Sequence, residues 1–246
     1  RRSIDFHSLK PETPHFRLGG DPQHLALVCA RLGVDISELD LITTIDRGAY
    51  EAHVKRFRDR RIIAADDFCL TPYGEKVERL PVAPDWAEIL VQAEESKDSQ
   101  LLNTAIVCAS AESLYDLIRK EHDFSEVGVE GSDHLTAHNI VVSALNQFGF
   151  IRGKNGDVEY GFEGDYVRKR FDKSIRQDVV EKGAFIQWCD QNGFNGKAIK
   201  EVALAMKSIY HQMRTYLPEP QEFGVVLANT PTHESFLHLL ANFSTA

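Results

Sequence analysis

The sequence contains no pair of closely spaced cysteines. Cys29, Cys69, Cys108 and Cys189 lie far apart along the chain, and none of them belongs to a Cys-x-x-Cys pair. This spacing excludes a zinc ribbon and a dithiol redox site, because both need neighbouring cysteines. We therefore predict that all four side chains are thiols in the protein core, where cysteine behaves as a small apolar residue.

Long hydrophobic runs are also missing. The apolar runs are far shorter than the ~18 residues that a membrane-spanning helix needs. The N-terminus has no apolar segment of the kind that forms the core of a secretory signal. These two absences predict an intracellular protein, cytoplasmic or nuclear, that has no membrane partner.

Positive charge is scarce. The chain has 28 Lys and Arg against 37 Asp and Glu, which gives a formal net charge of -9. Non-specific affinity for nucleic acid comes from neutralising phosphates, so the surface as a whole is not suited to that ligand. Any nucleic acid would have to bind a local basic surface.

The length of 246 residues, with 43% hydrophobic residues, is enough for one large domain or two small ones. Residues 1–20 show no apolar period and contain two prolines, so we expect an arm or linker there. The chain begins with Arg1 and Arg2 and has no initial methionine. We interpret it as a piece of a longer protein.

The sequence has no complete nucleotide-binding or catalytic motif. Gly193 and Gly196 precede a lysine, as in a phosphate loop, but that motif needs four residues between its glycines. Ala198 stands where the motif has the Ser or Thr that binds magnesium. His233 and His238 are one residue further apart than the histidines of a zinc protease, which turns the second imidazole about 100° away on a helix. We therefore expect no catalytic residue, no metal site and no cofactor in this chain.

Cap and period signals near the N-terminus predict two helices, over 22–32 and over 47–60. Two short apolar runs, 62–64 and 68–70, then flank an acidic turn and predict a small hairpin. Helices followed by a hairpin within residues 21–84 resemble a winged-helix domain.

Apolar periodicity predicts a helical bundle over residues 85–217. One helix should begin at Asp85, after a proline. Leu101–Ala111 is almost wholly apolar, so a helix there should be buried on most sides. Asp133 is expected to cap a further helix that ends near Phe148.

The pattern changes over residues 150–182. Asn155-Gly156 lies between short β-prone pieces and predicts a hairpin or an irregular excursion. An apolar residue every fourth position from Val167 to Val179 then predicts a helix. That segment contains the most basic cluster of the chain, a second candidate basic surface: Arg168, Lys169, Arg170, Lys173 and Arg176. Residues 218–246 should form a proline-rich linker followed by a short amphipathic helix.

The longest periodic stretch follows Gly196 and ends before Pro218. Apolar residues at spacings of three and four predict one long helix with a single buried face. A separate arc beside that face, interrupted by Leu204, contains five basic residues: Lys197, Lys200, Lys207, His211 and Arg214. Glu201 lies outside the arc, so we expect an arc without acids. Composition alone leaves two interpretations open, a solvated lysine face or a surface that binds phosphates.

Three segments in this order, residues 70–84, 131–139 and 188–192, resemble the C-terminal accessory region of the DEAH-box and RNA helicase A-like ATP-dependent RNA helicases. The first is similar to the family's leucine-threonine, glycine, proline-x-x-proline passage. The second is similar to its glycine-aspartate-histidine-leucine segment, and the third to its tryptophan-cysteine-x-x-asparagine turn before the so-called ratchet helix.

The resemblance implies a non-catalytic module of an ATP-dependent helicase, with a winged helix first and a ratchet-like bundle second. The RecA-like domains that bind ATP and magnesium would lie elsewhere in the parent protein, and an OB-fold would follow residue 246. The ligand implied is single-stranded RNA, with DNA as an open alternative. Asn192, Asn195, Lys197 and Lys200 match positions where the family has polar and basic residues.

The sequence departs from the family at two kinds of position. Lys197 and Met206 stand where arginine is usual, and Gly193 and Gly196 replace bulkier residues, which weakens the carry-over of the RNA contact. The connection between Leu135 and Trp188 is longer than usual, so residues 150–182 are interpreted as an insertion.

Two other classes of function fit the same sequence. A stand-alone winged-helix nucleic-acid-binding regulator with a helical dimerisation bundle would need a basic recognition helix. The segment 46–60 supplies one, with Arg47, Lys55, Arg56, Arg58 and Arg60. An adaptor that binds only protein would fit the acidic net charge.

Overall fold

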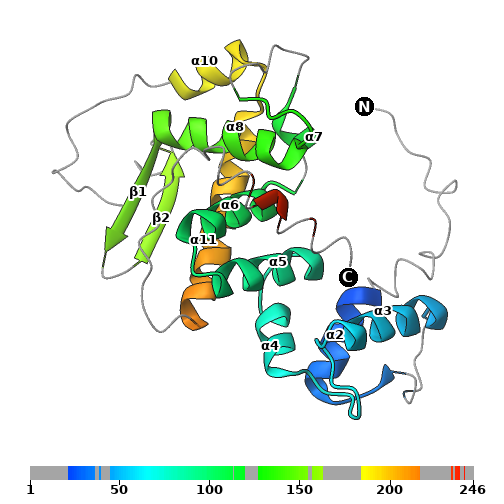
Figure 1. Cartoon of the computed structure of the whole chain (residues 1–246). Helices are drawn as coiled ribbons and strands as arrows, with labels where there is room; N and C mark the ends of the chain where they lie inside the picture. Colours follow the sequence, from blue (N-terminus) through cyan, green and yellow to red (C-terminus); the bar gives the residue numbers. More distant parts are fainter. Residues whose placement is uncertain are drawn as a thin grey trace, which may run out of the picture. The chain divides into compact units, whose positions relative to one another are not determined.

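Helices are the main elements of this computed structural model (Figure 1). The structure describes residues 22–36, 39, 45–112, 114–119, 127–154, 157–162, 184–216, 234, 236–238 and 241. The chain divides into two compact units, Arg1–Arg79 and Leu80–Ala246. The mainly α fold predicted from the sequence is confirmed, and the β content is small.

The described part of the first unit has three helices: α2 (Pro22–Leu32), α3 (Arg47–Asp59) and α4 (Pro72–Glu78). α3 begins as the sequence predicts, because Asp46 Oδ1 accepts a hydrogen bond from the Ala49 N–H at 3.0 Å. Its buried face consists of Tyr50, Val54 and Phe57, which are spaced for one side of a helix. The 22–32 and 47–60 predictions are therefore confirmed to within one residue.

A turn over residues 62–71 connects α3 to α4. The two predicted strands are reduced to a single antiparallel bridge between Ile63 and Leu70. Two backbone hydrogen bonds of 2.9 Å support it, from Ala64 N to Cys69 O and from Thr71 N to Ile62 O.

The second unit contains six helices among its described residues: α5 (Pro84–Glu95), α6 (Ser99–Ser110), α7 (Leu114–Leu117), α8 (Asp133–Phe148), α10 (Ala184–Gln191) and α11 (Gly196–Tyr216). α6 packs against α5, α8 and α11, and Figure 1 shows α11 crossing behind it. Because α6 has neighbours on several sides, its residues from Leu101 to Ala109 are buried except Asn103. The prediction of a helix buried on most sides is confirmed.

Two helix starts differ from the sequence-based predictions. α8 begins at Asp133, and its cap is Ser132, whose Oγ accepts from the Leu135 N–H at 3.3 Å. Asp133 instead lies in the first turn, where a carboxylate is favoured by the helix dipole. α5 begins at Pro84, one residue before Asp85, and Ala83 at its N-cap makes no side-chain hydrogen bond.

Burial differs from the prediction at one of the four cysteines, and the large aromatic Trp188 is not fully buried. Cys29, Cys108 and Cys189 are buried, whereas Cys69 is partly exposed because it lies in the 62–71 turn. Trp188 is only partly buried. Its ring packs between Phe148 and Phe194, with centroid distances of 5.5 and 5.2 Å.

The hairpin predicted around Asn155-Gly156 is confirmed. Strands β1 (Gly149–Lys154) and β2 (Asp157–Phe162) pair antiparallel, with Gly149 opposite Phe162 and Lys154 opposite Asp157. Figure 1 shows the hairpin beside α8, and β2 contacts α11. The 149–162 hairpin therefore packs on the bundle.

Several predictions fall outside the described residues. These are the arm at 1–20, the turn at 155–156, the basic segment at 167–179 and most of 218–246. In the last of these, Phe236 is buried and Leu237 is exposed. No helix within the described ranges has both the length and the apolar character needed to cross a membrane.

Candidate nucleic-acid interface

α11 has two distinct faces. The buried face is the predicted one: Ile199, Val202, Ala203, Met206, Ile209, Tyr210 and Met213 are each at most 7% exposed. On the predicted basic arc, Lys197, Lys207 and His211 are exposed and Lys200 is partly exposed. Arg214 belongs to α11, but its side chain is outside the described part of the structure. The arc therefore lies outside the packed core, as the helical period requires.

An acid lies beside the arc at its N-terminal end. Glu201 Oε1 lies 3.6 Å from Lys197 Nζ, one helical turn away. Residues four apart on a helix meet at the surface, so Glu201 pairs with a cation of the arc although it is not one of the arc's own residues. An exposed apolar side chain, Leu204, interrupts the arc further along and is 65% exposed.

Asn195 has a structural role at the start of α11. Its Oδ1 accepts from the backbone N–H groups of Lys197 and Ala198 at 3.2 and 3.4 Å, so it caps the helix. Its Nδ2 donates to the carbonyl of Asp116 at 2.9 Å, and its backbone N–H donates to Leu117 O at 2.7 Å. The amide therefore holds the end of α7 against the beginning of α11.

Asn192 builds the turn between α10 and α11. Its Nδ2 donates to the Trp188 carbonyl at 2.8 Å. Gly193 follows with φ +68°, a left-handed conformation that glycine adopts without strain. The predicted polar residues Asn192 and Asn195 thus shape the end of the helix that presents Lys197 and Lys200.

Arg119 also lies at this end of the helix, although the sequence did not indicate it. Its Nη2 donates to Asn195 Oδ1 at 3.2 Å, and its Nη1 lies 3.6 Å from Asp190 Oδ1. Its backbone N–H donates to Gly193 O at 2.8 Å, next to the bridge between Ile118 and Phe194. Because Arg119 and Asn195 are 76 residues apart, only the folded chain brings them together.

The charges around the α10–α11 turn affect a buried thiol. Burial raises the pKa of Cys189 to about 11, and Asp190 acts in the same direction, whereas Arg119 and Lys200 lower it. The Lys200 Nζ lies 5.7 Å from the centroid of the Phe185 ring, within range of a cation–π contact. Cations from two separate segments thus converge on one end of α11.

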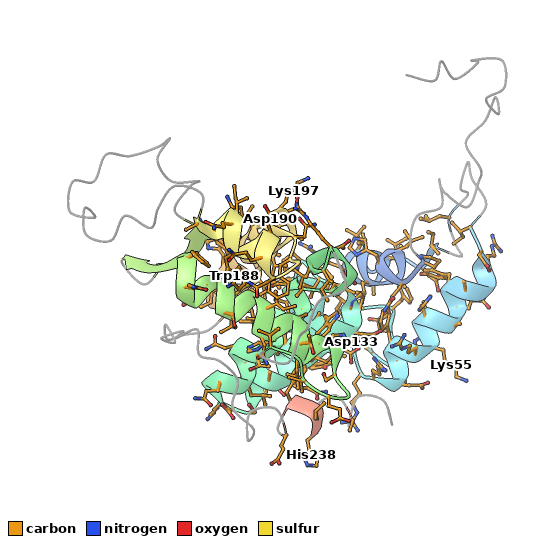
Figure 2. All side chains as sticks on the ribbon, turned by 90° about the horizontal axis from the view of Figure 1, so that it is seen from above. Lys55, Asp133, Trp188, Asp190, Lys197 and His238 are labelled. Carbon is orange, nitrogen blue, oxygen red and sulfur yellow. The ribbon has the colours of Figure 1, made fainter. Side chains whose placement is uncertain are left out.

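The second candidate basic surface, Arg168 to Arg176, lies outside the described residues. In the first unit, three cations of α3, Arg47, Lys55 and Arg58, are exposed. Arg58 Cζ lies 6.0 Å from the Phe68 ring centroid, and Figure 2 labels Lys55 on the same helix. Helix α3 and the 62–71 turn therefore contact one another on a partly basic surface.

Within the described ranges, no group of three or more His, Cys, Asp or Glu is arranged to hold a metal ion. A cavity of about 280 Å³ in the first unit is lined by Ala30, Arg31, Cys69, Leu70, Glu75, Glu78 and Arg79. Its charged residues pair with one another, Arg31 with Glu78 at 3.1 Å and Arg79 with Glu75 at 3.8 Å.

The N-terminal end of α11 is therefore the strongest candidate site for binding nucleic acid. Three exposed or partly exposed cations lie there: Arg119, Lys197 and Lys200. Comparison with known proteins assigns this site to no family: no protein-family model matches the chain, and no curated protein matches its sequence.

Proposed function

We propose that this chain is a non-catalytic accessory module of an ATP-dependent, DEAH-box-type RNA helicase, and that α11 lines a channel for single-stranded RNA. The main support is that the arc Lys197, Lys200, Lys207 and His211 lies outside the buried face of a 21-residue helix. This helix follows α10 and the turn at Asn192, and the segment Trp188–Asn192 resembles the one before the family's ratchet helix.

The physical argument depends on how single strands are bound. Proteins that track a single-stranded backbone use a row of cations, often with apolar or aromatic side chains that contact bases. α11 has a row of cations along about 20 Å of helix, at 1.5 Å per residue, and the exposed Leu204 lies among them. This composition suits a sugar-phosphate backbone with accessible bases better than it suits an acidic peptide alone.

The finer fold assignment is part of the same proposal. The order α2, α3, bridged turn and α4 is compatible with a winged-helix domain in the first unit. The packing of α6 against α5, α8 and α11 is compatible with a ratchet-like bundle in the second. In the parent, ATP and magnesium would bind the RecA-like domains, and an OB-fold would be a further neighbour.

The proposal is tested by measuring single-stranded RNA affinity of the chain at low ionic strength. Lys197→Ala/Lys200→Ala removes two cations from α11, and Arg47→Ala/Lys55→Ala removes two exposed cations from α3 as the matched control. We expect the α11 pair to weaken binding roughly tenfold or more, at about 1 kcal/mol per phosphate contact, and the α3 pair to have a much smaller effect. Binding that is absent, or that the α11 pair leaves unchanged, would contradict the proposal.

The same experiment tests the alternative, a stand-alone winged-helix regulator. The observation in its favour is the exposed basic face of α3, where Arg58 lies over Phe68. If the α3 variant loses affinity, especially for duplex, while the α11 variant does not, the regulator is the better assignment. The helicase module is preferred because four acids lie on or beside α3 and its turn: Glu51, Asp59, Asp66 and Asp67.

A further inference from the structure

Arg119 is positioned to contact whatever binds at the start of α11. Its guanidinium hydrogen-bonds Asn195, the residue that caps this helix, and its side chain remains 52% exposed. The backbone hydrogen bond from Arg119 N–H to Gly193 O fixes the segment that holds it. A guanidinium held in this way presents several N–H donors in a planar fork, which suits a phosphate group.

Two carboxylates compete for the cations at this end. Asp190 lies 3.6 Å from Arg119, and Glu201 lies 3.6 Å from Lys197, with the four side chains between 52% and 82% exposed. In the view of Figure 2, the labels of Asp190 and Lys197 lie at one edge of the second unit, apart from that of Asp133. Exposed ion pairs of this length are weak and exchange partners readily. A phosphate that approaches either cation must therefore displace a carboxylate.

We propose that Arg119 binds phosphate together with Lys197, and that Asp190 and Glu201 lower the affinity of this surface by competing with phosphate for these two cations. The inference depends on the proposed function, because it takes single-stranded nucleic acid as the ligand. Its consequence is a surface whose contacts form and break easily. Such contacts suit a strand that moves past the helix rather than one that stays bound.

The acid competition is tested by removing both carboxylates without changing side-chain size, as Asp190→Asn/Glu201→Gln. The probe is a labelled oligouridine of about 12 nucleotides, near the length bound by one single-strand site. We expect binding about two- to fivefold tighter per substitution, the factor that corresponds to an exposed ion pair. The control Glu130→Gln/Asp133→Asn removes two exposed acids elsewhere in the second unit and gives the same change in net charge. It should tighten binding less than about twofold, since exposed charges beyond a Debye length are screened.

The phosphate contact of Arg119 is tested with Arg119→Gln and Arg119→Lys. Arg119→Gln should weaken oligouridine binding by a similar two- to fivefold factor, the estimate for an exposed charge contact. Arg119→Lys keeps the charge but not the planar fork, so it should recover part of the affinity. Partial recovery separates a phosphate contact, which uses the charge, from a purely structural role through the hydrogen bond to Asn195, which depends on the guanidinium. Equal losses in both variants, or no loss in either, would overturn the assignment.

The results separate this inference from the proposed function. If Lys197→Ala/Lys200→Ala weakens binding but Asp190→Asn/Glu201→Gln has no more effect than its control, the acid competition is wrong and the interface stands. If neither pair changes affinity, both the interface and the inference fail. Circular dichroism of each variant at the measurement temperature verifies that the helices are intact.

Discussion

Gly74 shows how one residue fixes the connection between a helix and the turn before it. A Cβ at this position would collide with the carbonyl of Ile62, and Thr71 Oγ1 also lies 2.6 Å from the Arg61 carbonyl. The first turn of α4 therefore packs directly on the backbone of Arg61 and Ile62, just after α3. Only glycine allows this approach, because the obstacle is backbone and cannot rotate away.

We predict that Gly74→Ala lowers the free energy of unfolding by about 2 kcal/mol or more, as overpacking against a fixed neighbour does. The measurement is urea-induced unfolding followed by circular dichroism. Gly48→Ala is the control, because its Cβ would lie 3.5 Å from Asp46 Oδ1, an ordinary contact in a helix. That substitution should be neutral or stabilise by up to ~1 kcal/mol. Equal stabilities for the two variants would show that the close approach at Gly74 is not constraining.

Tyr50 makes the stability of the first unit sensitive to alkaline pH. Burial raises the pKa of Tyr50 from 10.0 to about 12, with Asp35 acting in the same direction and the backbone at Ile36 opposing it. A group whose folded pKa is raised contributes stability that is complete below its unfolded pKa and is lost as pH rises. The window of loss therefore runs from pH 10 to about pH 12.

We expect the denaturation midpoint of the wild-type chain to fall across this window more steeply than that of Tyr50→Phe, which has no hydroxyl to ionise. Below pH 10 the difference between their denaturation midpoints should not change with pH. The comparison uses the slope of stability with pH, so a constant offset between the proteins does not matter. Parallel curves would contradict a folded-state pKa raised by burial.

Among the elements, the bundle helices were the most predictable part of the fold. α6, α8 and α11 have long apolar periods, and local signals such as Asp46 before α3 define an end directly from sequence. Predictions of helix caps and strands failed where a neighbouring residue or a tertiary contact could replace the predicted local one. Ser132 rather than Asp133 caps α8, and the 62–71 turn keeps only one bridge, because such details depend on tertiary contacts more than on pattern.

The candidate site was predictable only in part. The arc of α11 followed from helical geometry, since residues three, four and seven apart share a face. Arg119 could not be found in that way, because its link to Asn195 spans 76 residues and no local pattern marks it. The roles of Asn192 and Asn195 as turn and cap residues could be identified only from the structure. In the sequence, an asparagine that binds a phosphate and one that binds the backbone have the same position before a basic helix.

The start of α11 supplies a test at this scale. Asn195→Ala removes both the helix cap and the hydrogen bond to the Asp116 carbonyl, so we expect a loss of about 1 to 2 kcal/mol of stability. Asn195→Asp keeps an oxygen that accepts from Lys197 and Ala198 but removes the donor to Asp116. It should lose clearly less than the alanine variant. Hydrogen exchange at the first turn of α11 measures the local effect, and unchanged protection in Asn195→Ala would show that the cap does not hold this end.

At the scale of the whole molecule, charge sets the character of any ligand binding. The net charge of -9 opposes nucleic acid in general, so any affinity must come from local clusters of cations such as the one at the start of α11. Binding by the chain should therefore be weak and strongly dependent on salt. In a parent helicase, further walls of the channel would supply the remaining contacts.

The most direct test of the central claim is the salt dependence of single-stranded RNA binding by the wild-type chain and by Lys197→Ala/Lys200→Ala. Each phosphate neutralised on a single strand adds about 0.7 to the slope of log affinity against log salt concentration. If both lysines contact phosphates, the variant should have a slope shallower by about 1.4, in addition to weaker binding. The same slope and affinity in both proteins would contradict the account and show that the arc is a solvated helix face.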